Sequence, residues 1–241
     1  MEKLIEGALH LGLPLTAQQV ELFQAYYDEL VDWNRRMNLT AIVDYDEVQV
    51  KHFLDSLTIT MILRDSPLKV ADVGTGAGLP GIALKIAYPN IELTLIDSTQ
   101  KKAAFLNHIV TTLGLEGVSV VIGRAEELAH DAHYREHFDA VLARGVAKLA
   151  SLAELTLPFC AVGGVFIAMK KREDRGEVDE SDVALRTLGG RLRQIIGIEL
   201  SGLSDRALVV IDKVTSTPDK YPRRSGIPQK RPLLRSTRGA S

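Results

Sequence analysis

The sequence predicts a doubly wound α/β fold, and three observations support that prediction. An apolar segment, 70–73, runs directly into a turn that contains Gly74, Gly76 and Gly78. From Lys69 onward, short apolar segments alternate with helical stretches, which is typical of repeated βα units. The last two predicted strands are separated by only five residues, 201–205, which is too short for a helix. We therefore expect a mostly parallel sheet that ends in an antiparallel pair.

The segment before the glycine-rich turn is expected to be helical. Thr16 with Gln19 has the spacing of a helix-capping box, and Asp44 with Glu47 repeats that spacing. Asn38 stands where a residue in the left-handed conformation would end the first of these helices. Two helix starts and one helix end are therefore marked by residue type alone.

The strands and helices after the turn follow from the same alternation. The predicted strands are mostly apolar on both faces, as parallel strands covered by helices should be; they lie at 69–74, 91–97, 118–123, 138–144, 164–170, 193–200 and 206–214. Helices are expected between them at 79–88, 99–114, 124–130, 148–158 and 177–190.

Length and composition narrow the class of protein. A chain of 241 residues fits one α/β domain, or one domain with a small appendage. No apolar run approaches the roughly 18 residues of a membrane span, and the first residues lack the pattern of a signal peptide. The single Cys160 cannot form an internal disulfide, which fits a reducing compartment.

Charge is unevenly distributed along the chain. The 24 residues from Pro218 onward contain seven Lys or Arg and one Asp, a formal charge of +6. Because the whole chain carries −2, residues 1–217 carry −8. An acidic body with a basic tail favours a polyanionic partner, and a solvated, disordered end is the alternative.

The glycine-rich turn predicts a nucleotide-like ligand. Gly74, Gly76 and Gly78 would let the backbone approach a ligand closely. Gly76, Gly78 and Gly81 also fit the G-x-G-x-x-G fingerprint of NAD-binding proteins. However, Asp72 lies two residues before the turn, where a carboxylate would repel a pyrophosphate and suit a cationic ligand with an amino acid end. This position, with the antiparallel end of the sheet, favours S-adenosylmethionine over NAD.

Polar residues stand at the ends of the later strands, where an open α/β sheet binds ligands. Asp97 is placed to accept hydrogen bonds from ribose hydroxyls, and it also suits the cap of the next helix. Glu126 is either a contact to an adenine edge or a favourable charge in a helix's first turn. Arg144 is expected to bind a carboxylate or a phosphate. The cations of 169–172 either flank the same crevice or form a solvated strand end.

The chain offers cations but no evident strong base or nucleophile. His52 and Asp55 share one helix face as an acid–base or a structural hydrogen-bonded pair, and two such residues make a poor metal site. Cys160 lacks the setting of a nucleophile. No Asn/Asp-Pro-Pro-Tyr motif follows the fourth strand. Such a site suits an acceptor that is already nucleophilic at neutral pH, such as guanine N7, with catalysis mainly by alignment.

Several of these motifs together resemble one known family. The chain is similar to the bacterial RsmG (GidB) family of 16S ribosomal RNA guanine-N7 methyltransferases. The motifs that carry the resemblance span nearly the whole chain in the family's order: Trp33–Ala41, His52–Ser56, Asp72–Gly81, Leu95–Ser98, Arg124–Glu126, Ala143–Arg144 and Tyr221–Pro232.

The resemblance implies a Rossmann-like class I methyltransferase fold. Its sheet would have seven mostly parallel strands with an antiparallel last strand, and N-terminal helices would precede it. It also implies a cytoplasmic enzyme, without metal or membrane, that uses S-adenosylmethionine to methylate a guanine of the 530 loop in the small ribosomal subunit or its assembly intermediate. We expect a helical extension at 1–66, a methyltransferase domain at 67–217 and a basic tail at 218–241.

The resemblance also assigns residues. The cofactor would be bound by Gly74, Leu79, Ala125, Glu126 and Arg144, and Arg144, at the junction with the substrate, is also the expected catalytic residue. The expected cofactor site is completed by Gly76 and Gly78 of the turn and by Asp97, which matches the usual ribose acid of the wider fold. RNA would be bound by Lys170, Arg223 and Arg224. In one departure, Met169-Lys-Lys171 stands where the family often has Leu-Lys-Gly.

Two other functions remain open from the residues alone. An NAD(P)-dependent oxidoreductase would explain the fingerprint and Asp97, but it lacks an evident proton donor. An RNA-binding assembly factor without enzymatic activity would explain the tail and retain the cofactor fold.

Overall fold

The computed structural model describes residues 1–66, 68–145 and 147–234. Its centre is a seven-stranded sheet with the strand order β3-β2-β1-β4-β5-β7-β6. The strands are β1 (Lys69–Val73), β2 (Glu92–Asp97), β3 (Val118–Ile122), β4 (Phe138–Arg144), β5 (Cys160–Lys171), β6 (Gly190–Gly197) and β7 (Arg206–Lys213). Pairs from β3 to β5 are parallel, and β7 lies between β5 and β6, antiparallel to both. The predicted fold is confirmed.

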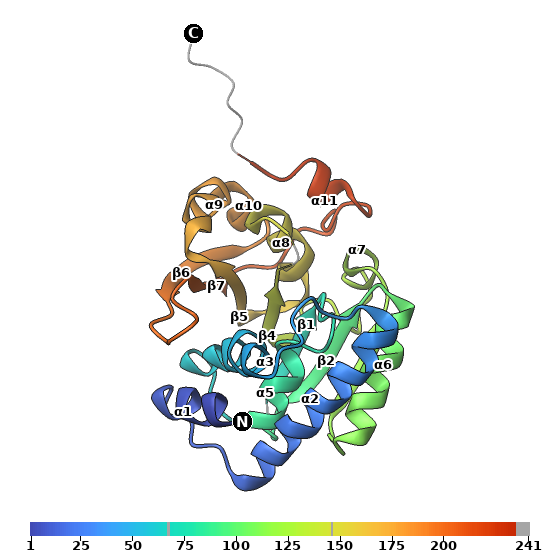
Figure 1. Ribbon diagram of the computed structural model, residues 1–241. Helices are drawn as coiled ribbons and strands as arrows, with labels where there is room; N and C mark the ends of the chain where they lie inside the picture. Colours follow the sequence, from blue (N-terminus) through green and yellow to red (C-terminus); the bar gives the residue numbers. More distant parts are fainter. Residues whose placement is uncertain (67, 146, 235–241) are drawn as a thin grey trace.

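Helices cover both faces of this sheet (Figure 1). On one face lie α1 (Glu2–His10), α2 (Ala17–Met37), the short helical turns α3 (Tyr45–Val48), η1 (Gln49–Leu54), α4 (Asp55–Leu57) and η2 (Thr58–Met61), and then α5 (Gly81–Ala87) and α6 (Gln100–Thr112). The other face carries α8 (Leu149–Thr156), η3 (Leu157–Phe159), α9 (Arg175–Glu180) and α10 (Asp182–Thr187). The elements α7 (Ala125–Leu128), η4 (Arg172–Asp174) and α11 (Ile227–Lys230) are short. None of the described helices is both long and apolar enough to cross a membrane.

Alternate residues of each strand separate the core into two clusters. Val70 of β1 belongs to the cluster that holds the N-terminal helices, whereas Ala71 and Val73 belong to the cluster under α8. This is the period of two expected of a strand that is covered on both faces. Phe23 and Tyr26 of α2 are fully buried in the first cluster, so the N-terminal helices share one core with the sheet.

The predicted helix boundaries of the N-terminal region are confirmed. Thr16 accepts a hydrogen bond from the Gln19 backbone, and the Gln19 side chain accepts one from the Thr16 backbone. Asn38 ends α2 in the left-handed conformation, with φ of 50°. The Asp44 side chain accepts hydrogen bonds from the backbone of Asp46 and Glu47.

Three predicted elements have wrong boundaries, and one of them is β6, which is predicted at 193–200 and observed at Gly190–Gly197. β5 begins at Cys160 instead of 164, because Cys160 pairs with Phe138 and a register shift then accommodates Gly163 and Gly164. Paired glycines in a strand interior usually mark such a bulge. The single helix predicted at 177–190 is two helices, α9 and α10, and Gly190 already belongs to β6.

After β7 the chain returns along the face that carries α8. We call residues 217–231 the C-terminal segment. Arg135 donates hydrogen bonds to the carbonyls of Thr217 and Tyr221, and Ser151 donates one to the carbonyl of Pro228. The tail predicted at 218–241 is therefore packed against the domain over this part, and residues 235–241 lie outside the described residues.

Candidate functional site

The strand order reverses at β1, which has β2 on one side and β4 on the other. The carboxyl ends of strands at such a switch point are the usual ligand site of an open α/β sheet. Directly after β1, the three glycines at 74, 76 and 78 have φ of 75°, 61° and 89°. Only glycine adopts this region without strain, so the local sequence determines the turn.

The three glycines have different surroundings. Gly74 lines a pocket at this end of the sheet, and a Cβ at Gly76 would meet only the Gly74 carbonyl, at 4.0 Å. A Cβ at Gly78 would instead lie 2.9 Å from the Tyr26 hydroxyl, which donates a hydrogen bond to the Ala77 carbonyl. Gly78 therefore allows helix α2 to pack against the turn.

Asp72 lies beneath the turn and is fully buried. Its Oδ2 accepts hydrogen bonds from Thr75 Oγ1 at 2.6 Å and from the Gly81 backbone at 2.8 Å. Its Oδ1 accepts none from the described residues. Burial raises the pKa of Asp72 to about 6. Asp72 thus fixes the shape of the turn from below. Because its carboxyl group is buried, it can favour a cationic ligand only through its electrostatic field.

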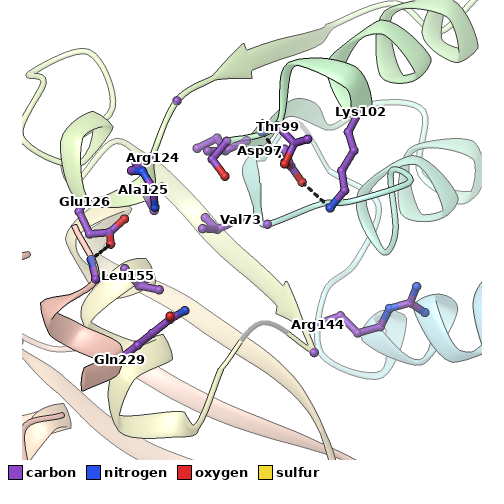
Figure 2. Close-up of a pocket in the computed structure, with 16 residues that line it drawn as sticks. Val73, Asp97, Thr99, Lys102, Arg124, Ala125, Glu126, Arg144, Leu155 and Gln229 are labelled. Atoms are coloured by element: carbon purple, nitrogen blue, oxygen red, sulfur yellow. Dashed lines mark hydrogen bonds and ion pairs between the residues drawn. The ribbon is translucent and has the colours of Figure 1, made fainter. Parts of the chain in front are cut away.

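Asp97 ends β2 beside the turn and lines the same pocket. Its Oδ2 accepts a hydrogen bond from the Gly76 backbone at 3.0 Å, and its Oδ1 accepts one from the Thr99 backbone at 2.9 Å. Lys102 Nζ lies 3.5 Å from Oδ2 (Figure 2). Asp97 therefore lines the pocket as expected, but it does not cap the next helix: the N-cap of α6 is Thr99, and no side chain among the described residues caps that helix.

We call this cavity the glycine-turn pocket. It has a volume of about 320 Å³ and is lined by the ends of β1, β2 and β4, by the start of α7, by Leu155 of α8 and by the C-terminal segment. Its size is within the range of small-ligand sites, roughly 300–1,000 Å³. Ala125 and Glu126 form one wall, and the Gly226 backbone donates a hydrogen bond to Glu126 Oε1 at 2.9 Å (Figure 2).

Arg144 ends β4 and lines the pocket with its inner part, while its guanidinium points away (Figure 2). Its Nη1 lies 3.3 Å from Asp55 Oδ2 and donates to the Lys51 carbonyl at 3.3 Å. Arg206 Nε lies 3.8 Å from Asp55 Oδ1. Burial raises the pKa of Asp55, although the charges of both arginines act to lower it. Arg144 is thereby fixed between the sheet and the N-terminal helices.

His52 and Asp55 do not form the predicted pair. Among the described residues, the ring of His52 bonds Thr40 Oγ1 through Nε2 at 2.8 Å, while Asp55 pairs with the two arginines. The buried carboxylate attracts the stronger, permanently charged partners. Burial and Arg144 lower the pKa of His52 to about 4, so its ring is neutral at physiological pH.

The remaining predicted residues lie outside the pocket. Leu79 is buried in the core, and Lys170 Nζ lies 2.8 Å from Glu177 Oε2. Arg223 donates through Nε and Nη2 to the carboxylate of Glu154, which is 0% exposed. Arg224 is exposed. The structure therefore brings five predicted residues to one pocket, namely Gly74, Asp97, Ala125, Glu126 and Arg144.

Comparison with known proteins identifies the family. The family model described as rRNA small subunit methyltransferase G (GidB) matches residues 19–208. The chain belongs to this family. It is 49% identical to ribosomal RNA small subunit methyltransferase G of Dehalococcoides mccartyi, over 97% of this chain and all of that one. The protein of the same name from Roseiflexus castenholzii is 46% identical, with the same coverage.

A solved structure shows the same fold at lower identity. A SAM-dependent methyltransferase from Aquifex aeolicus superimposes with a TM-score of 0.54 at 16% identity, over 71% of this chain and 94% of that one. Membership of a methyltransferase family sets aside the oxidoreductase and the purely RNA-binding alternatives.

The residues of the glycine-turn pocket fit S-adenosylmethionine. Asp97 places in the pocket a carboxylate of the kind that accepts hydrogen bonds from hydroxyl groups, Gly74 leaves room for close backbone approach, and Val73 and Leu155 provide an apolar wall. Ala125 stands at the start of α7, beside the position expected for an adenine. No cluster of three or more His, Cys, Asp or Glu suited to a metal occurs in the part of the chain that the structure describes.

Sequence reasoning missed the wall made by Gly226 and Gln229. The stretch 221–232 is recognisable as a motif, and its basic residues predict an RNA contact. The missing information was its tertiary position: Glu126 and Ser151 hold this stretch over the pocket, which no local pattern reveals.

Proposed function

We propose that the chain transfers a methyl group from S-adenosylmethionine to N7 of a guanine in the 530 loop of 16S ribosomal RNA. The acceptor would be the small ribosomal subunit or an assembly intermediate in the cytoplasm. The observation that carries the proposal is the glycine-turn pocket in a chain of the rRNA small subunit methyltransferase G family.

The pocket residues would divide the work of binding. S-adenosylmethionine supplies an electrophilic methyl group on a sulfonium sulfur. Asp97 would accept hydrogen bonds from the ribose, and the backbone around Gly74 would lie against the amino acid end. Ala125 and Glu126 would flank the base. Arg144, at the far end of the pocket, would separate the cofactor from the acceptor.

The acceptor chemistry agrees with the titratable groups present. Guanine N7 has a lone pair and carries no proton, so its methylation needs no general base. The neutral His52 bonds Thr40, and burial raises the pKa of Cys160 to about 12, which keeps its thiol protonated. The chain's own residues therefore act by aligning the reactants, an effect that can supply several kcal/mol of the barrier.

Transfer of labelled methyl groups tests this proposal. Small subunits whose RNA lacks the modification are incubated with the protein and labelled S-adenosylmethionine. We expect label in the small-subunit RNA and none in RNA that carries adenine at the target position. Label in protein alone would contradict the proposal. Calorimetry should show binding of S-adenosylmethionine and none of NADH.

A further inference from the structure

The glycine-rich turn, residues 74–78, has two halves with different neighbours. The first half, at Gly74, lines the glycine-turn pocket. The second half, at Ala77 and Gly78, packs against helix α2 of the N-terminal region. The shape of the half that lines the pocket therefore depends on how the other half is held.

The turn is intrinsically adaptable, because its glycines have no side chain to restrict the backbone. Gly74, Gly76 and Gly78 all have positive φ, and glycine adopts positive and negative φ about equally readily. The peptide group between residues 77 and 78 can therefore rotate unless another part of the molecule holds its carbonyl. A ligand binds more tightly to a site whose bound conformation is already fixed.

Tyr26 of α2 holds that carbonyl. Its hydroxyl donates a hydrogen bond to the Ala77 carbonyl at 2.5 Å, and its side chain is fully buried. Burial raises the pKa of Tyr26, so the phenol stays protonated and can donate throughout the physiological pH range. A buried carbonyl without a donor is unfavourable. The hydrogen bond therefore favours one orientation of the peptide group that follows Ala77.

The ring of Tyr26 is itself fixed by aromatic packing. It stacks on Phe53, with ring centroids 5.1 Å apart and an interplanar angle of 30°. The ring of Phe53 also lies 5.1 Å from that of Phe23, and all three rings are fully buried. The hydroxyl thus reaches the turn from a rigid support. A Cβ at Gly78 would lie 2.9 Å from this hydroxyl, so the sequence of the turn leaves room for it.

We propose that Tyr26 is a positioning residue for the cofactor: its hydroxyl holds the glycine-rich turn in the conformation that binds S-adenosylmethionine. Tyr26 acts through the turn and does not itself line the pocket. The N-terminal helices would then contribute to cofactor affinity, beyond sharing a core with the sheet. The inference rests on the proposed function and extends its cofactor site to α2.

The test removes one hydroxyl and keeps its ring. Tyr26→Phe is compared with Tyr88→Phe, because the Tyr88 hydroxyl also donates to a backbone carbonyl, that of Leu63 at 3.3 Å, beyond the end of α5 that is remote from the turn. Affinity for S-adenosylmethionine is measured by calorimetry on the full-length proteins. Hydrogen–deuterium exchange is followed for the backbone amides of residues 74–79, and kcat and KM are measured with small subunits as acceptor.

We expect Tyr26→Phe to weaken S-adenosylmethionine binding at least fivefold and to speed exchange of the turn amides. The loss should appear in the KM for S-adenosylmethionine, with kcat within twofold of the wild type, because bound ligand then holds the turn in place. Tyr88→Phe should stay within twofold of the wild type in affinity and in exchange. A merely structural role of Tyr26 would instead lower the unfolding midpoint in urea and leave the affinity of the folded protein unchanged.

The wild-type protein provides a second test if Tyr26→Phe does not fold. Without ligand, its turn amides should already exchange slowly, because the turn is held before the cofactor binds. Turn amides that become protected only when S-adenosylmethionine is added would contradict the inference.

The inference would also be overturned by an affinity of Tyr26→Phe within twofold of the wild type, or by a loss equal to that of Tyr88→Phe. Failure of the proposed function gives a different result. The wild-type protein would then bind S-adenosylmethionine and methylate no guanine of the small-subunit RNA, while the affinities of the two variants would still decide the role of Tyr26.

Discussion

Cations gather in two regions of this protein, and the two differ in what the cations do. In the C-terminal segment they follow one another in the sequence, yet Arg223 is bound to the buried Glu154. A second cavity lies beyond Arg144, and we call it the basic cavity because Lys51, Lys170, Lys171 and Arg206 line it together with Arg144. Its cations come from four distant parts of the chain. A run of basic residues in the sequence therefore does not show which cations are structural and which are accessible. The tertiary contacts of each cation show it.

The C-terminal segment also closes the glycine-turn pocket. Gly226 and Gln229 line the pocket, and Glu126 holds Gly226 in place. Its tertiary contacts thus serve the cofactor side of the site, while its exposed cations, such as Arg224, face solvent. The basic cavity lies on the other side of Arg144, toward the N-terminal helices.

The largest expected effect separates two neighbours, Arg223 and Arg224. Arg223→Ala should lower the free energy of unfolding by about 3 kcal/mol, because it leaves the carboxylate of Glu154 buried without its charged partner. Arg224→Ala should change it by less than about 0.5 kcal/mol. Urea unfolding measures both. Equal, small effects would show that Arg223 is no more structural than its exposed neighbour.

Asp72 should give the protein a pH-dependent stability of about 3 kcal/mol, because burial raises its pKa from 3.8 to about 6. The folded state keeps this proton to about pH 6, whereas the unfolded chain loses it near pH 4. The contribution is therefore complete below pH 4 and is lost as the pH rises through 6. We expect Asp72→Asn to remove this slope when unfolding is followed from pH 4 to 7.

The same measurement links the turn to the basic cavity. Arg144 lowers the pKa of Asp72, so Arg144→Ala should move the loss of stability to higher pH. An unchanged midpoint in that variant would show that the field of Arg144 does not reach the turn.

Arg144→Ala should lower kcat/KM for methyl transfer at least tenfold, about 1.4 kcal/mol of transition-state stabilisation. Arg144 lines the glycine-turn pocket, and in the proposed function it lies between the cofactor and the acceptor, so its loss should disturb their alignment. Arg193→Ala is the matched control, because Arg193 of β6 is also in an ion pair, with Asp212 of β7. A kcat/KM for Arg144→Ala equal to that of the control would refute this role.

The smallest effect is expected on RNA binding by the C-terminal segment. Arg224→Ala should reduce the slope of log affinity against log salt by about one and leave affinity for S-adenosylmethionine unchanged. Binding of labelled small-subunit RNA at several salt concentrations measures it. An unchanged slope would show that Arg224 makes no phosphate contact.

Local patterns predicted much of the fold. The capping box of Thr16 and Gln19, the left-handed Asn38 and the strand–helix alternation each depend on neighbouring residues, so the sequence alone revealed them. The bulge in β5 depends on pairing between Cys160 and Phe138. That pairing joins distant segments and leaves no local signature.

The same distinction explains which site residues were predictable. Gly74 and Asp97 follow directly from strand ends and glycine spacing. The partners of Asp55 do not, because Arg144 and Arg206 reach it from β4 and β7. The i,i+3 spacing of His52 and Asp55 indicated a shared face correctly but could not show that stronger charged partners lay across the cavity.

The central claim is methyl transfer to guanine N7, and the position of the modification tests it most directly. Small subunits that lack the modification are incubated with the protein and S-adenosylmethionine, and their RNA is digested and analysed by mass spectrometry. We predict one new N7-methylguanine, located in the 530 loop, and none when S-adenosylmethionine is omitted. Methylation at another atom of guanine, or no new methyl group in the RNA, would contradict the account.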